Sequence, residues 1–174
     1  MKRMLFLSCL LAGLSFNAHA QTPYLSGPDE QHPEVTVLTG IISKYTLQNL
    51  PMFGWYQTNY NGYTPDSSLV SALEKNKETI QVILFAGTWC DDSQFIIPKF
   101  FHCQEKSGFP DSHVSFFGVN RSKQTLGNIA QALNITNVPT FIVMKNGKEL
   151  GRVVEYGKTG KWDAELAQII LSGN

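Results

Sequence analysis

The feature that most constrains the fold is a continuous apolar run at Gln81–Ala86, which leads through a short turn into a helical pattern. An unbroken apolar run of this length is typical of a strand that is buried on both faces of a sheet. After the turn, apolar residues recur at helical spacing, which predicts a helix from Asp91 to about Glu105. Pro98 interrupts this pattern and should kink the helix. A buried strand that passes directly into a helix predicts an α/β domain.

The segments that follow complete a mixed sheet. In chain order we expect a second buried strand at His113–Val119, a helix from Leu126 to Leu133, a strand at Thr140–Met144, a returning strand at Leu150–Glu155 and a closing helix that begins near Trp162. Asn146-Gly147 is a strong signal for a hairpin turn between the last two strands, so Gly147 has a structural role. The β-α-β unit requires parallel strands and the hairpin requires an antiparallel pair. The prediction is therefore a mixed β-sheet with helices on both faces.

Residues 21–64 precede this domain and form an N-terminal extension. Gln21–Glu34 carries three prolines and one glycine, which predicts a flexible lead-in. Val35–Ile42 is rich in β-branched residues and predicts a strand. Met52–Tyr63 is rich in aromatic residues, which we interpret as packing surface rather than a binding platform. Thr64-Pro65 resembles a helix cap followed by a first-turn proline, so the domain proper is placed at 65–174, beginning with a helix at Pro65–Lys75.

The first twenty residues have the pattern of a secretory signal peptide. Lys2 and Arg3 precede a short apolar run at Met4–Leu14, and small residues at Ala18 and Ala20 offer a cleavage site. Residues 1–20 are therefore expected to be removed, and the protein to be periplasmic or secreted. Two alternatives are a buried N-terminal helix and a lipoprotein anchored through Cys9, whose sequence context fits a lipidation motif poorly.

The net charge of the chain and the positions of its cysteines limit which partners and which cysteine chemistry are possible. The chain has 14 basic and 14 acidic residues, so it offers no electrostatic case for nucleic acid or an anionic membrane as partner, and no membrane contact is expected after signal cleavage. Of three cysteines, Cys9 leaves with the signal. Cys103 lies 13 residues beyond Cys90 along the same predicted helix, roughly 20 Å at about 1.5 Å per residue. That separation excludes a disulfide, and Cys103 shares an apolar face with its neighbours, which indicates a core residue.

Cys90 lies where the buried strand passes into the helix. A helix N-terminus stabilises a thiolate, which is the nucleophilic form of cysteine. Asp91 and Asp92 follow immediately and repel it, and the sequence leaves the balance between these effects open. Ser93 lies one helical turn on, where its hydroxyl is placed to donate a hydrogen bond to the Cys90 sulfur. By itself, Trp-Cys-x-x-Ser also fits a small buried cysteine near a turn.

The surroundings of Cys90 resemble the thioredoxin superfamily. Trp89-Cys90-Asp91-Asp92-Ser93 stands where thioredoxins carry Trp-Cys-Gly-Pro-Cys, Pro98 matches their helix-kinking proline, and Val138-Pro139-Thr140 resembles their cis-proline loop. Lys145-Asn146-Gly147 matches the hairpin of that family. The motif is most similar to a secreted bacterial branch with Trp-Cys-Gly-Asp-Ser. The resemblance covers roughly Pro65 to Asn174.

This resemblance implies a thioredoxin-like fold and a secreted thiol-disulfide exchange protein. Cys90 and Ser93 would be catalytic, while Trp89, Val138, Pro139 and Thr140 would bind an extended substrate segment beside the thiol. Ser93 replaces the second cysteine that releases a mixed disulfide in dithiol thioredoxins. Leu84 stands where many thioredoxins have a buried aspartate. Both departures favour monothiol or isomerase-like exchange with protein thiols and disulfides, with release by an external thiol that the sequence does not name.

Three alternatives to this exchange activity are kept. One is a non-catalytic binding module that uses the Val138–Thr140 edge and the aromatic-rich N-terminal segment to hold a partner. Another is peroxide scavenging through a sulfenic acid at Cys90. The third is a metal site built from Cys90, Asp91 and Asp92 with His102 or His113, but no histidine or cysteine pair has zinc spacing. We expect neither a metal nor a cofactor.

Overall fold

The computed structural model describes residues 22–173, so the predicted signal peptide and Cys9 lie outside the described residues. One six-stranded sheet has the order β1-β2-β4-β3-β5-β6. Its strands are β1 (Tyr24–Pro28), β2 (Thr36–Ile41), β3 (Ile80–Ala86), β4 (Val114–Gly118), β5 (Thr140–Lys145) and β6 (Lys148–Val154). β3 is parallel to β4 and antiparallel to β5, so the sheet is mixed, as predicted.

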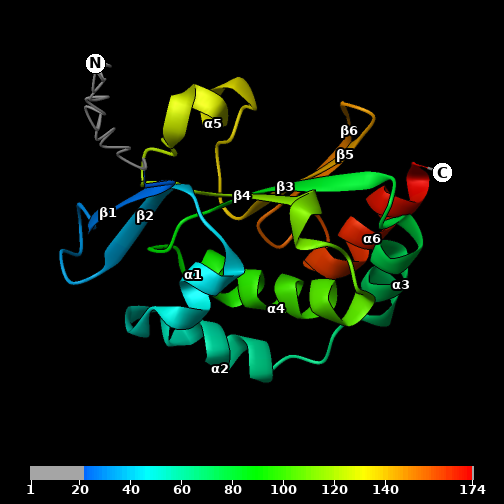
Figure 1. The fold of residues 1–174 in the computed structure, drawn as a ribbon, viewed down its shortest axis with the longest axis horizontal. Coiled ribbons are helices and arrows are strands. Elements are labelled where there is room, and N and C mark those ends of the chain that lie inside the picture. Colours follow the sequence, from blue (N-terminus) through cyan, green and yellow to red (C-terminus); the bar gives the residue numbers. More distant parts are fainter. Residues whose placement is uncertain (1–21, 174) are drawn as a thin grey trace, which may run out of the picture.

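Helices cover both faces of this sheet (Figure 1). The short helix α5 (Ile129–Ala132) lies on one face. The opposite face carries α1 (Lys44–Asn49), α2 (Trp55–Asn61), α3 (Ser67–Asn76), α4 (Asp91–Ser107) and α6 (Trp162–Ser172). The predicted α/β class, with helices on both faces, is confirmed.

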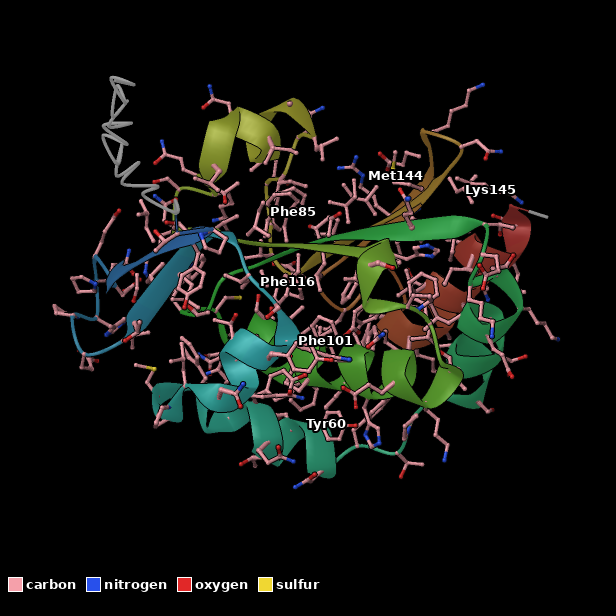
Figure 2. The ribbon with its side chains drawn as sticks, in the orientation of Figure 1. Tyr60, Phe85, Phe101, Phe116, Met144 and Lys145 are labelled. Atoms are coloured by element: carbon pink, nitrogen blue, oxygen red, sulfur yellow. The ribbon has the colours of Figure 1, made fainter. Side chains whose placement is uncertain are left out.

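Each face of the sheet has its own apolar core, and β3 contributes to both. Leu84 belongs to the larger core, which the five-helix face covers, while the neighbouring Phe85 belongs to the smaller core under α5. Figure 2 shows Phe85 on the α5 side of the sheet and Phe101 on the α4 side. Leu84 and Phe85 are both fully buried. The unbroken apolar run is thus explained by a central strand with no solvent-facing side.

The N-terminal extension is part of the same sheet. β1 pairs antiparallel with β2, and β2 pairs antiparallel with β4, so both strands extend the sheet at one edge. The prediction that Gln21–Glu34 is a flexible lead-in is wrong for Tyr24–Pro28, which forms β1. Prolines are compatible with this edge strand because Pro23 precedes it and Pro28 ends it. The aromatic-rich segment contains α2, which packs along α4.

Two helix starts differ from the sequence prediction. α3 begins at Ser67 rather than Pro65, because the Asp66 side chain accepts a hydrogen bond from the Leu69 N–H at 2.9 Å and caps the helix there. The helix expected from Leu126 is short. Gly127 and Asn128 have φ angles of 60° and 57°, in the left-handed region, and α5 starts only after them.

The β5–β6 hairpin follows the prediction closely. Asn146 and Gly147 both have positive φ, 52° and 74°, between the paired residues Lys145 and Lys148. A two-residue turn with positive φ at both positions matches the twist of the strands that it joins. Gly147 therefore has the structural role expected of it.

Pro98 lies inside α4 and removes one helical hydrogen bond. Having no N–H, it leaves the carbonyl of Gln94, four residues earlier, without its usual donor. The side-chain amide of Asn59, on α2, donates to this carbonyl at 3.2 Å and also to the carbonyl of Trp55 at 3.0 Å. Asn59 therefore supplies the donor that Pro98 lacks and ties α2 to the helix that carries Cys90.

Replacing Asn59 by alanine should remove this substitute donor. We expect Asn59→Ala to lower the free energy of unfolding by about 1 kcal/mol, the usual net contribution of one hydrogen bond. The matched control is Asn61→Ala, on the same helix, whose side chain makes only an exposed bond to Gln57. Urea unfolding of the two variants measures the difference, and equal losses would show that the Gln94 carbonyl does not need Asn59.

Candidate functional site

The turn between β3 and α4 holds Cys90 as the N-cap of the helix. Its backbone is extended, with φ −98° and ψ 121°, and its carbonyl accepts the first helical hydrogen bond from the Gln94 N–H at 2.9 Å. The Cys90 N–H donates to the carbonyl of Gly87 at 3.0 Å. These two bonds fix the backbone on both sides of the thiol, which is half-buried and free.

The loop before β5 lies directly against this thiol. The Cys90 sulfur is 3.3 Å from the backbone carbonyl of Val138, to which the thiol donates a hydrogen bond. The Val138–Pro139 peptide bond is cis. The Val138 and Pro139 side chains are buried, so the part of this loop that meets the sulfur is the backbone.

Thr140 lies in the same loop but faces inward. Its side chain is buried, and its hydroxyl donates to the carbonyl of Asn137 at 2.7 Å. Its backbone pairs with Val154 on β6 and with Phe85 on β3. Thr140 therefore closes the loop and holds Val138 in place, rather than offering a side chain to a substrate.

Trp89 forms a flat surface beside Cys90. Its indole N–H donates to the carbonyl of Val119, at the end of β4, at 2.9 Å. A Cβ at Gly87 would lie 2.6 Å from the indole ring, so only glycine lets the ring pack this closely. The guanidinium of Arg121 lies over the ring, 4.7 Å from its centroid, in cation–π geometry.

Ser93 has a different role from the one expected. Its buried hydroxyl accepts a hydrogen bond from the Gly87 N–H at 3.2 Å. Among the hydrogen bonds of residues 22–173 none joins Ser93 to the Cys90 sulfur, which instead bonds to Val138. The correction follows from geometry, because the side chain turns under the loop and satisfies a buried donor there. Ser93 therefore supports the turn that carries Cys90.

Two more side chains, neither of them expected from the sequence, tie this turn to its surroundings. The buried Thr88 hydroxyl accepts from the Leu38 N–H at 3.1 Å and donates to the carbonyl of Thr36 at 2.8 Å, both on β2. The side-chain amide of Gln94 donates to the carbonyl of Thr88 at 2.9 Å. The N-terminal extension thus holds the turn from one side and α4 from the other.

An ion pair links the β1–β2 loop to the residue stacked on Trp89. Arg121 Nε donates to both carboxylate oxygens of Asp29, at 2.9 and 2.8 Å, and Asp29 is 3% exposed. The same carboxylate accepts from the N–H groups of Gln31 and His32. Burial by itself would raise the pKa of Asp29, but these hydrogen bonds and the nearby guanidinium hold the pKa below its ordinary value.

An open cleft of about 550 Å³ lies in front of Cys90. Its walls come from two distant parts of the sequence. One wall is the β1–β2 loop and the other is the turn and first residues of α4, and the lining residues are His32, Glu34, Val35, Trp89, Cys90, Asp91, Asp92, Gln94 and Arg121. The volume lies in the range of about 300–1,000 Å³ that is usual for binding sites.

Comparison with known proteins identifies the family. A sequence model of the thioredoxin family matches residues 63–170. The chain belongs to the thioredoxin family. It is 34% identical over 90 residues to a thioredoxin-like protein of Acanthamoeba polyphaga mimivirus, covering 52% of this chain and 63% of the relative. It is 33% identical over 93 residues to an H-type thioredoxin of Brassica oleracea, covering 53% of this chain and 69% of that protein.

Solved structures include similar chains. The crystal structure of reduced Schistosoma mansoni thioredoxin is 31% identical, with a TM-score of 0.41, and the match covers 63% of this chain and 93% of that one. The chain spans 63% and 58% of the length of the mimivirus relative and of a thioredoxin from Oryza sativa subsp. japonica. The family match begins at residue 63, so β1, β2, α1 and α2 lie outside it.

Cys103, the other cysteine within residues 22–173 of this thioredoxin-family chain, lies inside the protein. Cys103 is fully buried in the larger core, and its sulfur lies 3.8 Å from the hydroxyl of Tyr63. Burial raises the pKa of Cys103, and the hydrogen bond to Tyr63 offsets only part of this increase, so that the pKa is about 11. The prediction that Cys103 is a core residue is confirmed. Its thiol is therefore neither accessible nor ionised at neutral pH.

The structure brings most of the predicted site residues together. Trp89, Cys90 and the Val138–Pro139 backbone meet at one sheet edge, whereas Ser93 and Thr140 are buried beneath it. Within residues 22–173 the protein contains no group of three or more histidine, cysteine and acidic side chains placed to hold a metal ion. No helix in this range combines the length and the apolar composition needed to cross a bilayer.

Sequence reasoning missed Asp29, Arg121, Thr88 and Gln94. Arg121 had a usable signal, because it follows β4, and the carboxyl ends of parallel strands meet at the same edge of a sheet. The buried carboxylate of Asp29 had none, since it lies in a proline-rich loop far from Cys90 in the sequence.

The different burial of the two thiols predicts selective alkylation. With iodoacetamide near neutral pH, Cys90 should be modified and Cys103 should stay unmodified until denaturant is added. Mass-spectrometric peptide mapping distinguishes the two sites. Modification of Cys103 at a similar rate in the native protein would contradict its placement in the core.

The Asp29–Arg121 pair predicts a specific loss of stability in acid. Because the pKa of Asp29 is lower in the folded protein than its ordinary value of 3.8, the pair stabilises the fold above that value and is lost as the pH falls through the folded pKa. Between about pH 6 and about pH 3, wild type should therefore lose more stability than Asp29→Asn, which cannot titrate. Urea unfolding at several pH values measures this, and parallel curves for the two proteins would contradict it.

Proposed function

We propose that this protein is a monothiol exchange protein in which Cys90 forms mixed disulfides with protein substrates. The observation that carries the proposal is a half-buried, free Cys90 thiol set against the Val138 backbone, with serine where a resolving cysteine would be. Family membership supports thiol redox chemistry. The placement of Cys103 in the core supports a mechanism that uses one sulfur.

The proposed reaction is a balanced thiol–disulfide exchange. The Cys90 thiolate attacks one sulfur of a substrate disulfide, a bond forms between these sulfurs, and the substrate S–S bond breaks. The second substrate sulfur leaves as a thiolate and takes a proton from water. No net oxidation or reduction occurs in this step.

Release requires a second thiol, and within residues 22–173 the other cysteine, Cys103, is buried in the core. A second cysteine of the substrate, as thiolate, attacks the substrate sulfur of the mixed disulfide, forms a new substrate disulfide and frees Cys90, which amounts to isomerisation. Alternatively, the thiolate of an external thiol attacks the same substrate sulfur, forms a mixed disulfide with the substrate and frees Cys90. In both routes the Cys90 sulfur leaves as thiolate and is ready for another cycle.

The backbone beside the thiol supports binding of an extended segment. The Val138 carbonyl lies at the sulfur, and Trp89 lines the cleft next to Cys90. A peptide backbone placed along the Val138 edge would gain hydrogen bonds of the strand-addition type and present its sulfur to Cys90. The N-terminal sequence pattern supports a periplasmic or secreted location, where protein disulfides form and persist.

The decisive test is exchange activity that depends on Cys90. Wild type should accelerate the recovery of native disulfides in scrambled ribonuclease, in a buffer of small thiol and disulfide, and Cys90→Ser should fall to the uncatalysed rate. The matched control is Cys103→Ala, which removes the buried thiol and should keep the activity if the variant folds. Omitting the small thiol should trap wild type as a mixed disulfide with the substrate through Cys90.

A second arm separates the monothiol mechanism from the binding-module alternative. Ser93→Cys places a thiol one helical turn beyond Cys90, so reduction of insulin disulfides with a chemical thiol as electron donor should increase. The proposal would be overturned if wild type gave neither a Cys90 adduct nor isomerisation and Ser93→Cys gained no reductase activity.

A further inference from the structure

We infer that the β1–β2 loop, residues 29–35, is a substrate-selecting wall of the Cys90 cleft, and that the Asp29–Arg121 ion pair holds this wall in place. The inference rests on the proposed exchange function and names its substrate class. Disulfides on extended, flexible peptide segments enter the cleft, whereas disulfides on the convex surface of a folded protein are excluded by the wall.

The wall lies outside the part of the chain that matches the thioredoxin family. His32, Glu34 and Val35 line the same cleft as Asp91 and Asp92, and the family match begins only at residue 63. Cys90 is therefore approached through an open cleft with the loop on one side, not across a flat surface. Access of this kind suits a single chain segment and hinders a bulky one.

Two internal hydrogen bonds give the loop a defined shape. The Asp29 N–H donates to the carbonyl of Val35 at 2.8 Å, and the Val35 N–H donates to the carbonyl of His32 at 2.8 Å. The first of these bonds joins the two ends of the loop. The Asp29 carboxylate adds two bonds to backbone N–H groups at its start. The wall is therefore an ordered turn.

Arg121 connects this turn to Trp89, which lies beside Cys90. Its guanidinium is shared between the buried Asp29 carboxylate and the face of Trp89. Asp29 has side-chain exposure of 1% and Arg121 of 23%, so the pair is shielded from water and from the salt screening that weakens exposed pairs. Removing either partner leaves the other charge uncompensated and should release the wall from Trp89.

The same pair leaves the thiol itself untouched. The Cys90 sulfur is held by Val138, and the turn before it is held by Ser93, Thr88 and Gln94. Loss of the ion pair should therefore change which substrates reach Cys90 while the hydrogen bonds that hold the thiol and its turn stay in place. Arg121 and Asp29 are positioning residues in this sense, because they act through the loop.

The test compares three disulfide probes that react through the same chemistry. The probes are dithiodipyridine, a short unstructured peptide whose cysteine carries a thiopyridyl group, and a small folded protein that carries the same group on a surface cysteine. Thiopyridone release gives each rate. Wild type should react readily with the first two and slowly with the third.

Asp29→Ala and Arg121→Ala should each raise, several-fold, the ratio of the rate with the folded probe to the rate that the same variant shows with dithiodipyridine. Arg121→Lys keeps the charge but loses the planar guanidinium, so it should be intermediate. The matched control is Lys123→Gln. The Lys123 Nζ also lies over Trp89, 5.5 Å from the ring centroid, but Lys123 takes no part in the ion pair with Asp29. This control should keep the wild-type selectivity.

Cys103 provides an internal control for unfolding. If a variant loses its fold, the buried Cys103 also reacts with the probe, and peptide mapping detects this reaction. In that case the selectivity is measured with Arg121→Lys instead of the alanine variants. Two results would contradict the role of the loop but not the exchange function. One is that wild type reacts equally fast with all three probes. The other is that Asp29→Ala and Arg121→Ala fold and keep the wild-type selectivity. Failure of wild type to react with any probe through Cys90 would overturn the exchange function, and the inference with it.

Discussion

The pairing of β3 with a parallel neighbour on one side and an antiparallel neighbour on the other determines where the site forms. Because β3 and β4 are parallel, they end at the same edge of the sheet, and because β5 is antiparallel to β3, it begins there. Cys90 follows β3, Arg121 follows β4 and Val138 precedes β5. The three segments meet as a consequence of strand direction, before any side chain contributes.

Side chains then convert this meeting point into a fixed thiol. The turn from Gly87 to Cys90 has to satisfy its backbone groups away from water, since Gly87 and Thr88 are buried. Two side chains of α4 do so, because Ser93 accepts from the Gly87 N–H and Gln94 donates to the Thr88 carbonyl. The Thr88 hydroxyl in turn bonds to β2. The thiol at the end of this turn is left with Val138 as its partner. A serine in the position of a second cysteine thus keeps a structural function, while it removes the sulfur that would resolve a mixed disulfide.

The sequence was sufficient to predict the α/β fold because the residue patterns of β3 and α4 each favour one kind of secondary structure. Within the run Gln81–Ala86, the residues after the exposed Gln81 are buried or partly buried on both faces, and the Asn146-Gly147 turn has the φ values that its residue types favour. β1 was not predictable, since its stability comes from pairing with β2, which overrides the proline content of the lead-in. The hydrogen bond expected between Ser93 and the Cys90 sulfur was wrong for a related reason. Residue type and spacing locate a hydroxyl near the site, but only the packed backbone decides which donor or acceptor it meets.

The N-terminal extension changes what the thioredoxin-family site can do. Through Thr88 it is bonded to the turn that carries Cys90, and through Asp29 it is bonded to the cation stacked on Trp89. The first connection is made by neutral groups and persists at any pH at which the protein is folded. The second depends on an ionised carboxylate and weakens in acid. Different interactions therefore support the turn and hold the β1–β2 loop. A substitution at the ion pair can alter the shape of the cleft while the backbone that presents the sulfur stays in place.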